Sequence, residues 1–298
     1  MKIYNNVNID KKFKHSVLIV GNFDGVHLGH QKVIKQAKIR AKKNNLKVGL
    51  ITFEPIPLMF FNKKIKNHRI SLLSQKIGLL KRIGLNFLII KKFDRNFSNY
   101  SPEKFIDYII FKKIKTKFLY VSKNFKFGKN RKGNIKTLKR FEEKAGFKTI
   151  ITHPLKNLKK TISSTLIRKK ISKGQIIYAN NLLGRKWSIT GKVVRGDMRG
   201  RKIGFPTCNI NLNNYIVPKL GVYSVLINSN KFKKKRGIAN IGYRPTFNGQ
   251  NLILEVNIFN FNQNLYDKKL TISFEKFIRN EKKFKNLKQL KKQIKNDI

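Results

Sequence analysis

The chain has 298 residues, of which 40% are hydrophobic and 11% aromatic, which is enough apolar material for two folded domains and excludes wholesale disorder. Cys208 is the single cysteine, which excludes an internal disulfide framework and a cysteine-rich zinc module. The first residues lack the apolar core of a signal peptide, and no apolar run approaches the roughly 18 residues of a spanning helix. We therefore expect a cytoplasmic protein.

The charge is extreme, with 68 lysines and arginines against 14 acidic residues and a formal net charge of +54. A nucleic-acid or anionic-membrane binder is one interpretation. A dedicated basic patch would be clustered and interleaved with aromatic residues, whereas these lysines are spread along the whole chain. We favour a general drift of composition toward Lys, Asn and Ile, and expect the charge to attract phosphorylated ligands and non-specific RNA.

The first half of the chain alternates apolar, strand-like runs with amphipathic, helix-like segments. Strands are predicted at 15–22, 47–54, 86–93, 117–123 and 147–154, and helices at 29–44, 72–84, 101–114 and 134–146. This alternation predicts a parallel, doubly wound α/β sheet, which binds ligands at the carboxyl ends of its strands.

Beyond Leu183 the pattern changes to short strands separated by turn residues. The expected strands lie at 187–196, 221–228, 234–242, 252–261 and 269–279, and a helix is expected at 286–297. Many short strands followed by a terminal helix predict a small antiparallel barrel. The sequence therefore predicts two domains, residues 1–183 and 184–298.

The stretch "GNFDGVHLGH" (21–30) follows the first strand directly. Its spacing is neither the dinucleotide fingerprint GxGxxG nor a P-loop. His27 and His30 could ligate a metal, although a zinc site needs a third protein ligand, and a glycine-rich turn with surface histidines is a further alternative. A phosphate site explains more, because the glycines allow close backbone approach and the following helix N-terminus favours anions.

Three motifs in order resemble the adenylyltransferase domain of the bifunctional prokaryotic riboflavin kinase/FAD synthetase family. They are "GNFDGVHLGH", "TFEPIPL" (52–58) and "ISSTLIR" (162–168). The resemblance implies a Rossmann-like nucleotidylyltransferase domain that adenylylates FMN. The implied catalytic residues are His27, His30 and Arg168; the implied nucleotide-binding residues are Gly21, Asn22, Phe23, Asp24, Gly25, Gly29, Ser163, Ser164 and Thr165; the implied flavin-binding residues are Phe53 and Pro55.

The stretch "GKVVRGDMRGRKIGFPTCNI" (191–210) could be a loop-rich edge of the barrel, but it resembles the riboflavin kinase motif of the same family. "GVYSV", "IANIGYRPTF", "LEV" and "FIRNEKKF" follow in family order, so the resemblance covers nearly the full chain. It implies Glu255 as the catalytic base, Gly196, Asp197, Gly200, Arg201, Gly204, Phe205 and Pro206 around ATP, Thr207 and Asn209 as Mg²⁺ ligands, and Arg279 and Glu281 at the flavin.

The chain departs from the family pattern mainly by losing acids. Ser122 stands where the family has glycine, and Asn124 and Asn134 stand where it has aspartate. Asn260 and Asn264 replace acids in the second domain, Asp267 replaces a glycine, and Cys208 stands where alanine is common, which predicts a small buried residue. The adenylyl step is weakened if one of the lost acids orients substrate or metal.

The resemblance implies a bifunctional enzyme that phosphorylates riboflavin to FMN and adenylylates FMN to FAD with release of pyrophosphate. Its substrates would be riboflavin, FMN and ATP with Mg²⁺, and we expect no specific nucleic acid, no membrane, and a monomer or weak homo-oligomer. A kinase with a decayed adenylyltransferase domain is the alternative. A basic nucleic-acid-binding protein on an enzyme scaffold is a third hypothesis, which predicts clustered lysines and lost catalytic residues.

Overall fold

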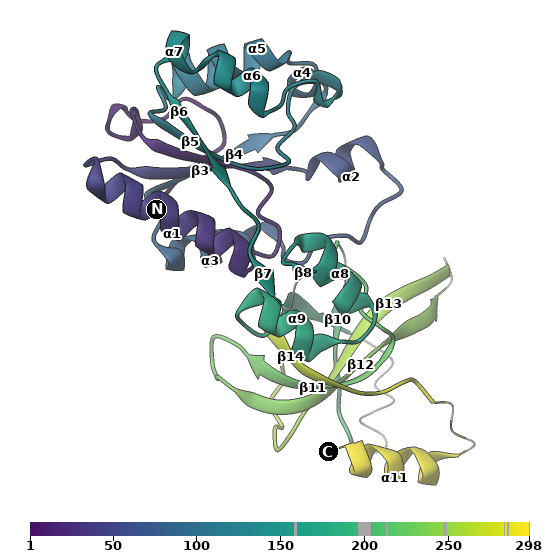
Figure 1. Ribbon diagram of the computed structural model, residues 1–298. Coiled ribbons are helices and arrows are strands. Elements are labelled where there is room, and N and C mark those ends of the chain that lie inside the picture. Colours follow the sequence, from purple (N-terminus) through teal and green to yellow (C-terminus); the bar gives the residue numbers. More distant parts are fainter. Residues whose placement is uncertain are drawn as a thin grey trace. The chain divides into compact units, whose positions relative to one another are not determined.

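A computed structural model describes residues 1–157, 160–195, 204–212, 214–246, 249–282, 284 and 286–297. The chain forms two compact units, which Figure 1 shows and which we describe separately. The first unit contains Met1–Lys66 and Lys76–Ser163, and the second contains Asn67–Gln75 and Ser164–Ile298. The second unit therefore includes a short segment from the first half of the sequence.

The first unit is built on a six-stranded sheet in the order β1-β4-β3-β2-β5-β6, in which every pair is parallel. After β2 the chain adds β3 and β4 on one side and then returns to add β5 and β6 on the other. The strand order thus reverses at β2, and such a switch point is where doubly wound sheets bind ligands. The strands are β1 (Lys2–Tyr4), β2 (Val17–Val20), β3 (Val48–Glu54), β4 (Phe87–Lys92), β5 (Phe118–Ser122) and β6 (Lys148–Thr152).

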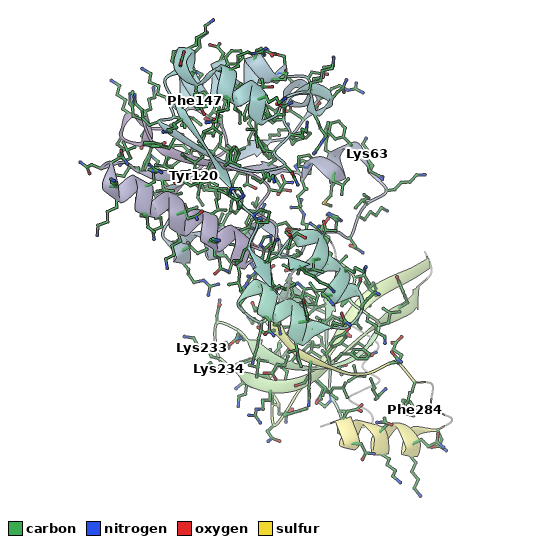
Figure 2. The ribbon with its side chains drawn as sticks, in the orientation of Figure 1. Lys63, Tyr120, Phe147, Lys233, Lys234 and Phe284 are labelled. Carbon is green, nitrogen blue, oxygen red and sulfur yellow. The ribbon has the colours of Figure 1, made fainter. Side chains whose placement is uncertain are left out.

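Both faces of this sheet are covered, as its continuous apolar strands require. Leu18 and Val20 belong to one core cluster, whereas Val17 and Ile19 belong to the other, because successive side chains of β2 point to opposite faces. Tyr120 of β5, which is labelled in Figure 2, donates from Oη to the carbonyl oxygen of Gln36 at 3.4 Å and so joins the sheet to α1.

The helices confirm the expected alternation, with differences in detail. The predicted helix at 101–114 is a short α-helix followed by a π-helical segment, and the one at 134–146 is divided at Phe141. The helical elements are η1 (Lys11–Phe13), α1 (Leu28–Lys43), α2 (Pro57–Phe61), α3 (Leu73–Ile83), α4 (Arg95–Ser98), α5 (Pro102–Lys104), η2 (Phe105–Lys113), η3 (Lys129–Arg131), α6 (Ile135–Arg140) and α7 (Glu142–Ala145), and a hairpin of β7 (Lys156–Asn157) and β8 (Lys160–Thr161) follows β6.

The second unit is a closed antiparallel barrel in the order β10-β13-β12-β11-β14-β9. Its buried side chains alternate along the strands and include Tyr223 and Phe274, as a one-sided sheet requires. The sequence does not predict β10, because its four residues, Cys208–Asn211, have no strand-like run of apolar side chains. The elements are α8 (Ser164–Ser172), α9 (Ile176–Leu183), β9 (Ser188–Val194), β10 (Cys208–Asn211), β11 (Gly221–Asn228), β12 (Lys235–Thr246), β13 (Gly249–Ile258), β14 (Lys269–Arg279) and α11 (Leu287–Asp297).

Buried hydrogen bonds attach the remaining segments to the barrel. Trp187 Nε1 donates to the carbonyl oxygen of Ile70 at 2.9 Å, which fixes the 67–75 segment. Asn180 of α9 donates to the carbonyl oxygen of Phe274 at 2.9 Å and accepts from the backbone N–H of Trp187 at 2.7 Å. A Rossmann-like parallel sheet followed by a small antiparallel barrel confirms the predicted fold class.

The single thiol is expected to be unreactive in the folded protein. Cys208 is partly buried on β10, and burial raises the pKa of its thiol to about 11. Because the thiolate is the reactive form, labelling by a disulfide reagent at pH 8 should be about a hundredfold slower in the native protein than in guanidinium chloride. The absorbance of the released thiolate measures both rates, and equal rates would show that Cys208 is an accessible, ionisable thiol.

Candidate active sites

The loop after β2 lies at the switch point of the parallel sheet. It takes an unusual backbone path, in which Phe23, Gly25 and Val26 have φ values of 48°, 78° and 41°. Left-handed conformations cost energy for residues other than glycine, above all for a β-branched valine, and such strain concentrates at functional sites. The path places the end of "GNFDGVHLGH" on the first turn of α1.

His27 caps α1 and lies inside the fold. Its Nδ1 accepts a hydrogen bond from the backbone N–H of His30 at 3.3 Å, and the residue is only 5% exposed. Because Nδ1 is the acceptor of this bond, Nε2 is the ring nitrogen that can act as a donor. Gly29 leaves room for this ring, since a Cβ at that position would lie 3.1 Å from two of its atoms.

Three rings form a stack at this site. The His30 ring lies between Phe23 and His27, with centroid separations of 4.4 and 3.6 Å. Burial, and then the charges of His27 and Lys76, lower the pKa of His30 well below its usual range. His30 Nδ1 is buried and has no hydrogen-bond partner among the described residues, which is costly unless a ligand supplies one.

The burial of His27 rules out a turn that merely exposes histidines, which was one of the alternatives for this stretch. Within the part of the chain that the structure describes, no group of three or more His, Cys, Asp or Glu residues is placed to hold a metal ion. A stacked pair of imidazoles at the N-terminus of a 16-residue helix instead suits an anion such as a phosphate.

Aromatic side chains gather where β3 and β4 end, and sequence reasoning identified only one of them. Phe53, a predicted flavin residue, lies 5.7 Å from Phe97 and 6.1 Å from Phe93 between ring centroids. Phe93 in turn contacts Phe60 and Phe61 of α2, and Phe61 is 69% exposed. Pro55 follows a cis peptide bond at this same place. The cluster offers an aromatic surface to a flat ring system.

A basic pocket of about 460 Å³ follows β5 at the carboxyl edge of the sheet. Its lining includes the cations Lys123, Lys126, Arg131 and Lys136, together with Asn124, Phe125, Asn134 and Ile135. The positive lining suits a phosphate-bearing ligand.

Asn134 lines this pocket and also caps α6. Its Oδ1 accepts from the backbone N–H of Thr137 at 3.2 Å, while Thr137 Oγ1 accepts from the backbone N–H of Asn134 at 3.3 Å. Asparagine caps helices about as well as aspartate does. This acid-to-amide change therefore preserves the local structure.

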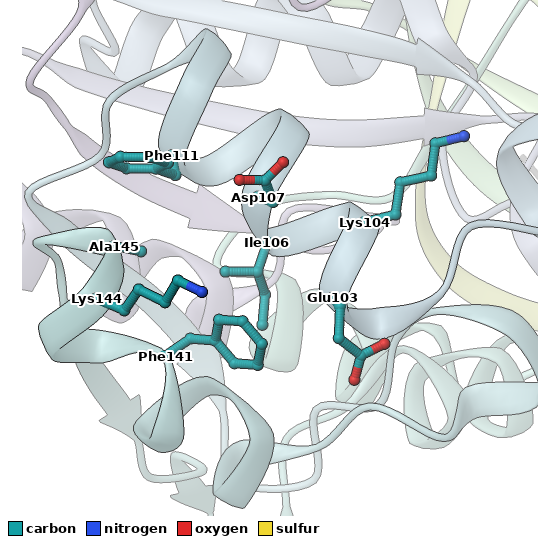
Figure 3. A pocket seen from close by; sticks show the side chains of 8 residues that line it. All are labelled: Glu103, Lys104, Ile106, Asp107, Phe111, Phe141, Lys144 and Ala145. Carbon is teal, nitrogen blue, oxygen red and sulfur yellow. The ribbon is translucent and has the colours of Figure 1, made fainter.

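A second cavity, of about 360 Å³, lies between α5, η2 and α7 (Figure 3). Two of its carboxylates form surface ion pairs, Asp107 with Lys112 at 2.8 Å and Glu103 with Arg140 at 3.8 Å. None of the predicted site residues lines it, and we assign it no role.

The motif "ISSTLIR" spans the division between the two units. Ser163 ends the first unit, whereas Ser164 and Thr165 form the first turn of α8 in the second. Arg168 donates from Nε to the carbonyl oxygen of His68 at 2.8 Å, which ties α8 to the 67–75 segment.

The barrel places three polar side chains in one row. Glu255 of β13 pairs with Asn209 of β10 on one side and with Asn240 of β12 on the other, and directly opposed residues share a face of the sheet. Asn240 Nδ2 donates to Glu281 Oε1 at 3.2 Å, so the row continues to a predicted flavin residue. A Cβ at Gly242 would lie 2.0 Å from that same oxygen, so the Glu281 carboxylate lies directly against this glycine.

Asn240 was not identified from the sequence, although it lies in the family-like segment "IANIGYRPTF". The available signal was alternation, because Ala239 and Ile241 are buried and leave Asn240 on the opposite face. The hydrogen bond of Asn240 to Glu281 joins residues that are 41 positions apart in the chain.

One end of the polar row suits a hard cation. Asn209 is 5% exposed, and its Oδ1 has no hydrogen-bond partner among the described residues. Thr207, half-buried, precedes it by two residues, and Asn257 Nδ2 donates to the carbonyl oxygen of Pro206 at 2.8 Å. A buried amide oxygen without a protein partner, two residues after a hydroxyl, is the donor chemistry that Mg²⁺ prefers.

The segment of the second motif that the resemblance assigns to ATP is described only in part. Gly204, at a φ of 85°, Phe205 and Pro206 lead into β10. The predicted ATP residues Gly196, Asp197, Gly200 and Arg201 lie outside the described residues.

Arg279 lies at the end of β14 and holds the terminal helix α11. It donates from Nε to Asp297 Oδ1 at 2.8 Å and from Nη2 to Oδ2 at 2.5 Å, and the two side chains are 16% and 3% exposed. This partly buried bidentate pair was not expected from the sequence, and a flavin contact of Arg279 stays a prediction.

The chain combines a parallel sheet that has two stacked imidazoles at its switch point with a barrel that has a carboxylate in register with two amides, an arrangement typical of a two-domain enzyme of phosphate transfer. Residues 9–166 match the family model of FAD synthetase, and residues 183–298 match that of riboflavin kinase. The chain belongs to the family of bifunctional riboflavin kinase/FMN adenylyltransferases.

Curated relatives support this assignment over the full length. A bifunctional riboflavin kinase/FMN adenylyltransferase of Buchnera aphidicola subsp. Schizaphis graminum is 42% identical over all of this chain and 97% of its own. The protein of that name from Bacillus subtilis is 41% identical over 95% of this chain and 90% of its own.

A solved structure, called a macrolide-efflux protein from Streptococcus pneumoniae, aligns over 99% of this chain and 96% of its own, with a TM-score of 0.87 and 31% identity. None of the helices described in our structure combines the length and the apolar character needed to cross a membrane.

Proposed function

We propose that this chain converts riboflavin to FAD in two ATP-dependent steps. The barrel domain phosphorylates riboflavin to FMN, and the Rossmann-like domain transfers an adenylyl group from a second ATP to FMN. The proposal rests on the ordered surroundings of the candidate reactive groups in both domains. His27 and His30 stack at the edge of the sheet, and Glu255 lies in register with Asn209 in the barrel.

In the adenylyl step, an oxygen of the FMN phosphate attacks the α-phosphorus of ATP. A new P–O bond forms as the bond to the bridging oxygen breaks, and pyrophosphate leaves with its electron pair. No covalent enzyme intermediate is needed, so positioning and charge neutralisation supply the catalysis. Nε2–H of His27 and the imidazole of His30 would bind phosphoryl oxygens at the N-terminus of α1. We assign the ATP phosphates also to Ser163, Ser164, Thr165 and Arg168.

The flavin of FMN is proposed to lie on the aromatic cluster at the ends of β3 and β4. Exposed Phe61 and its neighbour Phe93 would contact the ring system, next to the predicted residues Phe53 and Pro55. The lysine- and arginine-lined pocket after β5 would favour the phosphate of the same ligand.

In the kinase step, the Glu255 carboxylate would accept the proton of the ribityl primary hydroxyl as that oxygen attacks the γ-phosphorus of ATP and ADP leaves. Thr207 Oγ1 and Asn209 Oδ1 would hold Mg²⁺, which neutralises phosphate charge when bound. Glu281, joined to the row through Asn240, would border the flavin.

The organisation around these steps completes the proposal. We place the functional boundary between Leu183 and Gly184, next to the first residue of the riboflavin kinase match. The enzyme would act in the cytoplasm on small molecules, as a monomer or a weak homo-oligomer, without a specific nucleic-acid partner.

The test is an incubation of the purified chain with riboflavin, MgATP and a reductant, followed by chromatographic separation of the flavins. We expect FMN to appear first and FAD to accumulate from it. FMN without FAD would support the decayed-adenylyltransferase alternative. Neither flavin, together with saturable and sequence-specific nucleic-acid binding, would support the third hypothesis.

A further inference from the structure

Lys76 of α3 is the one lysine among the described residues that is buried, and its exposed fraction is 0%. A fully buried lysine is rare, because removing an ammonium from water is costly unless other groups compensate it. A methionine of similar length would fill the same space without that cost. The ammonium therefore calls for an explanation beyond packing.

The ammonium of Lys76 joins three elements of the first unit. Its Nζ donates to the carbonyl oxygen of Asn22 at 2.9 Å and to Thr52 Oγ1 at 3.0 Å, and that hydroxyl in turn donates to the same carbonyl at 2.9 Å. Asn22 belongs to the loop after β2, and Thr52, which is also fully buried, belongs to β3. The closed triangle fixes the start of the loop against α3 and the end of β3.

This triangle leads directly to the histidine stack. Asn22 precedes Phe23, whose left-handed backbone turns its ring onto His30 at a centroid separation of 4.4 Å. A hydrogen-bonded carbonyl immediately before a strained residue restricts the alternatives that the loop can adopt. The charge of Lys76 also acts on His30, since it is one of the causes that lower the pKa of that imidazole.

We propose that Lys76 is a positioning residue for adenylyl transfer: its ammonium holds the Asn22 carbonyl so that Phe23 and His30 stay stacked, and it provides a fixed positive charge behind the phosphate site. It acts through the loop and through its electric field, without touching the substrate. This inference rests on the proposed adenylylation of FMN. Preorganised charge and backbone of this kind contribute most in the transition state.

The test compares Lys76→Met with the wild-type full chain. We expect kcat for FAD formation from FMN and MgATP to fall about tenfold or more. Riboflavin phosphorylation by the same protein should change less than about twofold, because its chemistry lies in the barrel. Lys38→Met is the matched control, since Lys38 Nζ donates to the carbonyl oxygen of Ile83 on the same helix α3 at 2.8 Å but is exposed. The control should retain both activities.

A second readout separates positioning from a general loss of structure. An NMR titration of the His30 imidazole should show a higher pKa in Lys76→Met than in the wild type, because a neighbouring positive charge disfavours protonation. Lys76→Arg, which keeps the charge, should leave that pKa low. A folded Lys76→Met protein with an unchanged FAD rate and an unchanged His30 pKa would overturn the inference.

If Lys76→Met loses the circular dichroism of the folded chain, Lys76→Gln decides. Glutamine keeps hydrogen-bond donors but carries no charge, so FAD formation should fall and the pKa of His30 should rise. An unchanged rate together with an unchanged His30 pKa in folded Lys76→Gln protein would then overturn the inference. If the wild-type protein forms no FAD, the proposed function itself is wrong. If the wild type and Lys76→Met form FAD equally fast, only the inference about Lys76 is wrong.

Discussion

Glu255→Gln should lower FMN formation from riboflavin by a factor of about 10²–10⁴, the range that general-base catalysis supplies. Glutamine keeps the shape of the side chain and its place between Asn209 and Asn240 but cannot accept the ribityl proton. FAD formation from supplied FMN should stay within about twofold of the wild type, because distant and independent sites contribute separately. Initial rates of each step, measured by separating the flavins, give both values.

The matched control is Glu275→Gln on β14 of the same barrel. Glu275 is half-buried, pairs with Lys186 at the surface and accepts a hydrogen bond from Ser224 Oγ at 3.1 Å. Exposed pairs of this kind contribute about 0–1 kcal/mol, so the variant should fold and keep both activities. Equal losses of FMN formation in the two variants would show that Glu255 has no special part in the reaction.

His30→Ala should have the opposite effect and lower FAD formation from FMN by about 10²–10³-fold, the cost of removing one preorganised donor at a developing charge. The substitution removes the central ring of the stack with Phe23 and His27. Riboflavin phosphorylation should be unaffected. Assays with FMN or riboflavin as the only added flavin distinguish the two steps.

His153→Ala is the control for this prediction, because His153 is exposed and belongs to the same unit. It should leave both rates unchanged. If His30→Ala and Glu255→Gln each abolished both activities in folded protein, our assignment of one reaction to each domain would be wrong.

The strand and helix order could be predicted because it depends on local patterns. The continuous apolar runs predicted the parallel sheet and the alternating runs predicted the barrel, because the spacing of apolar residues indicates which faces of a strand are buried. Strand β10 was missed because Cys208–Asn211 combines one apolar position with small and polar ones.

The interior of the first site could not be predicted in the same way. The histidine stack depends on positive φ angles at Phe23 and Val26, which residues other than glycine seldom adopt. Lys76 gave a weaker signal: it lies four residues before the buried Leu80, on the core face of α3, where a lysine is out of place. The contact of Arg279 with Asp297 joins a strand to a helix 18 residues later and has no local signature.

The loss of family acids now has a partial structural explanation. Asn134 preserves a helix cap. Asn124 lines a pocket whose other polar residues are Asn134 and four cations. An amide at position 124 makes this pocket more positive than an aspartate would. Tighter binding of phosphate-bearing ligands is the physical consequence.

The most direct test of the central claim mixes Glu255→Gln protein with His30→Ala protein in the presence of riboflavin and MgATP. Each variant alone should fail to produce FAD from riboflavin, whereas the mixture should produce it, because FMN made by the intact barrel of one chain can be adenylylated by the intact sheet domain of the other. A mixture that makes no FAD, under conditions in which the wild-type chain does, would contradict two separate active sites.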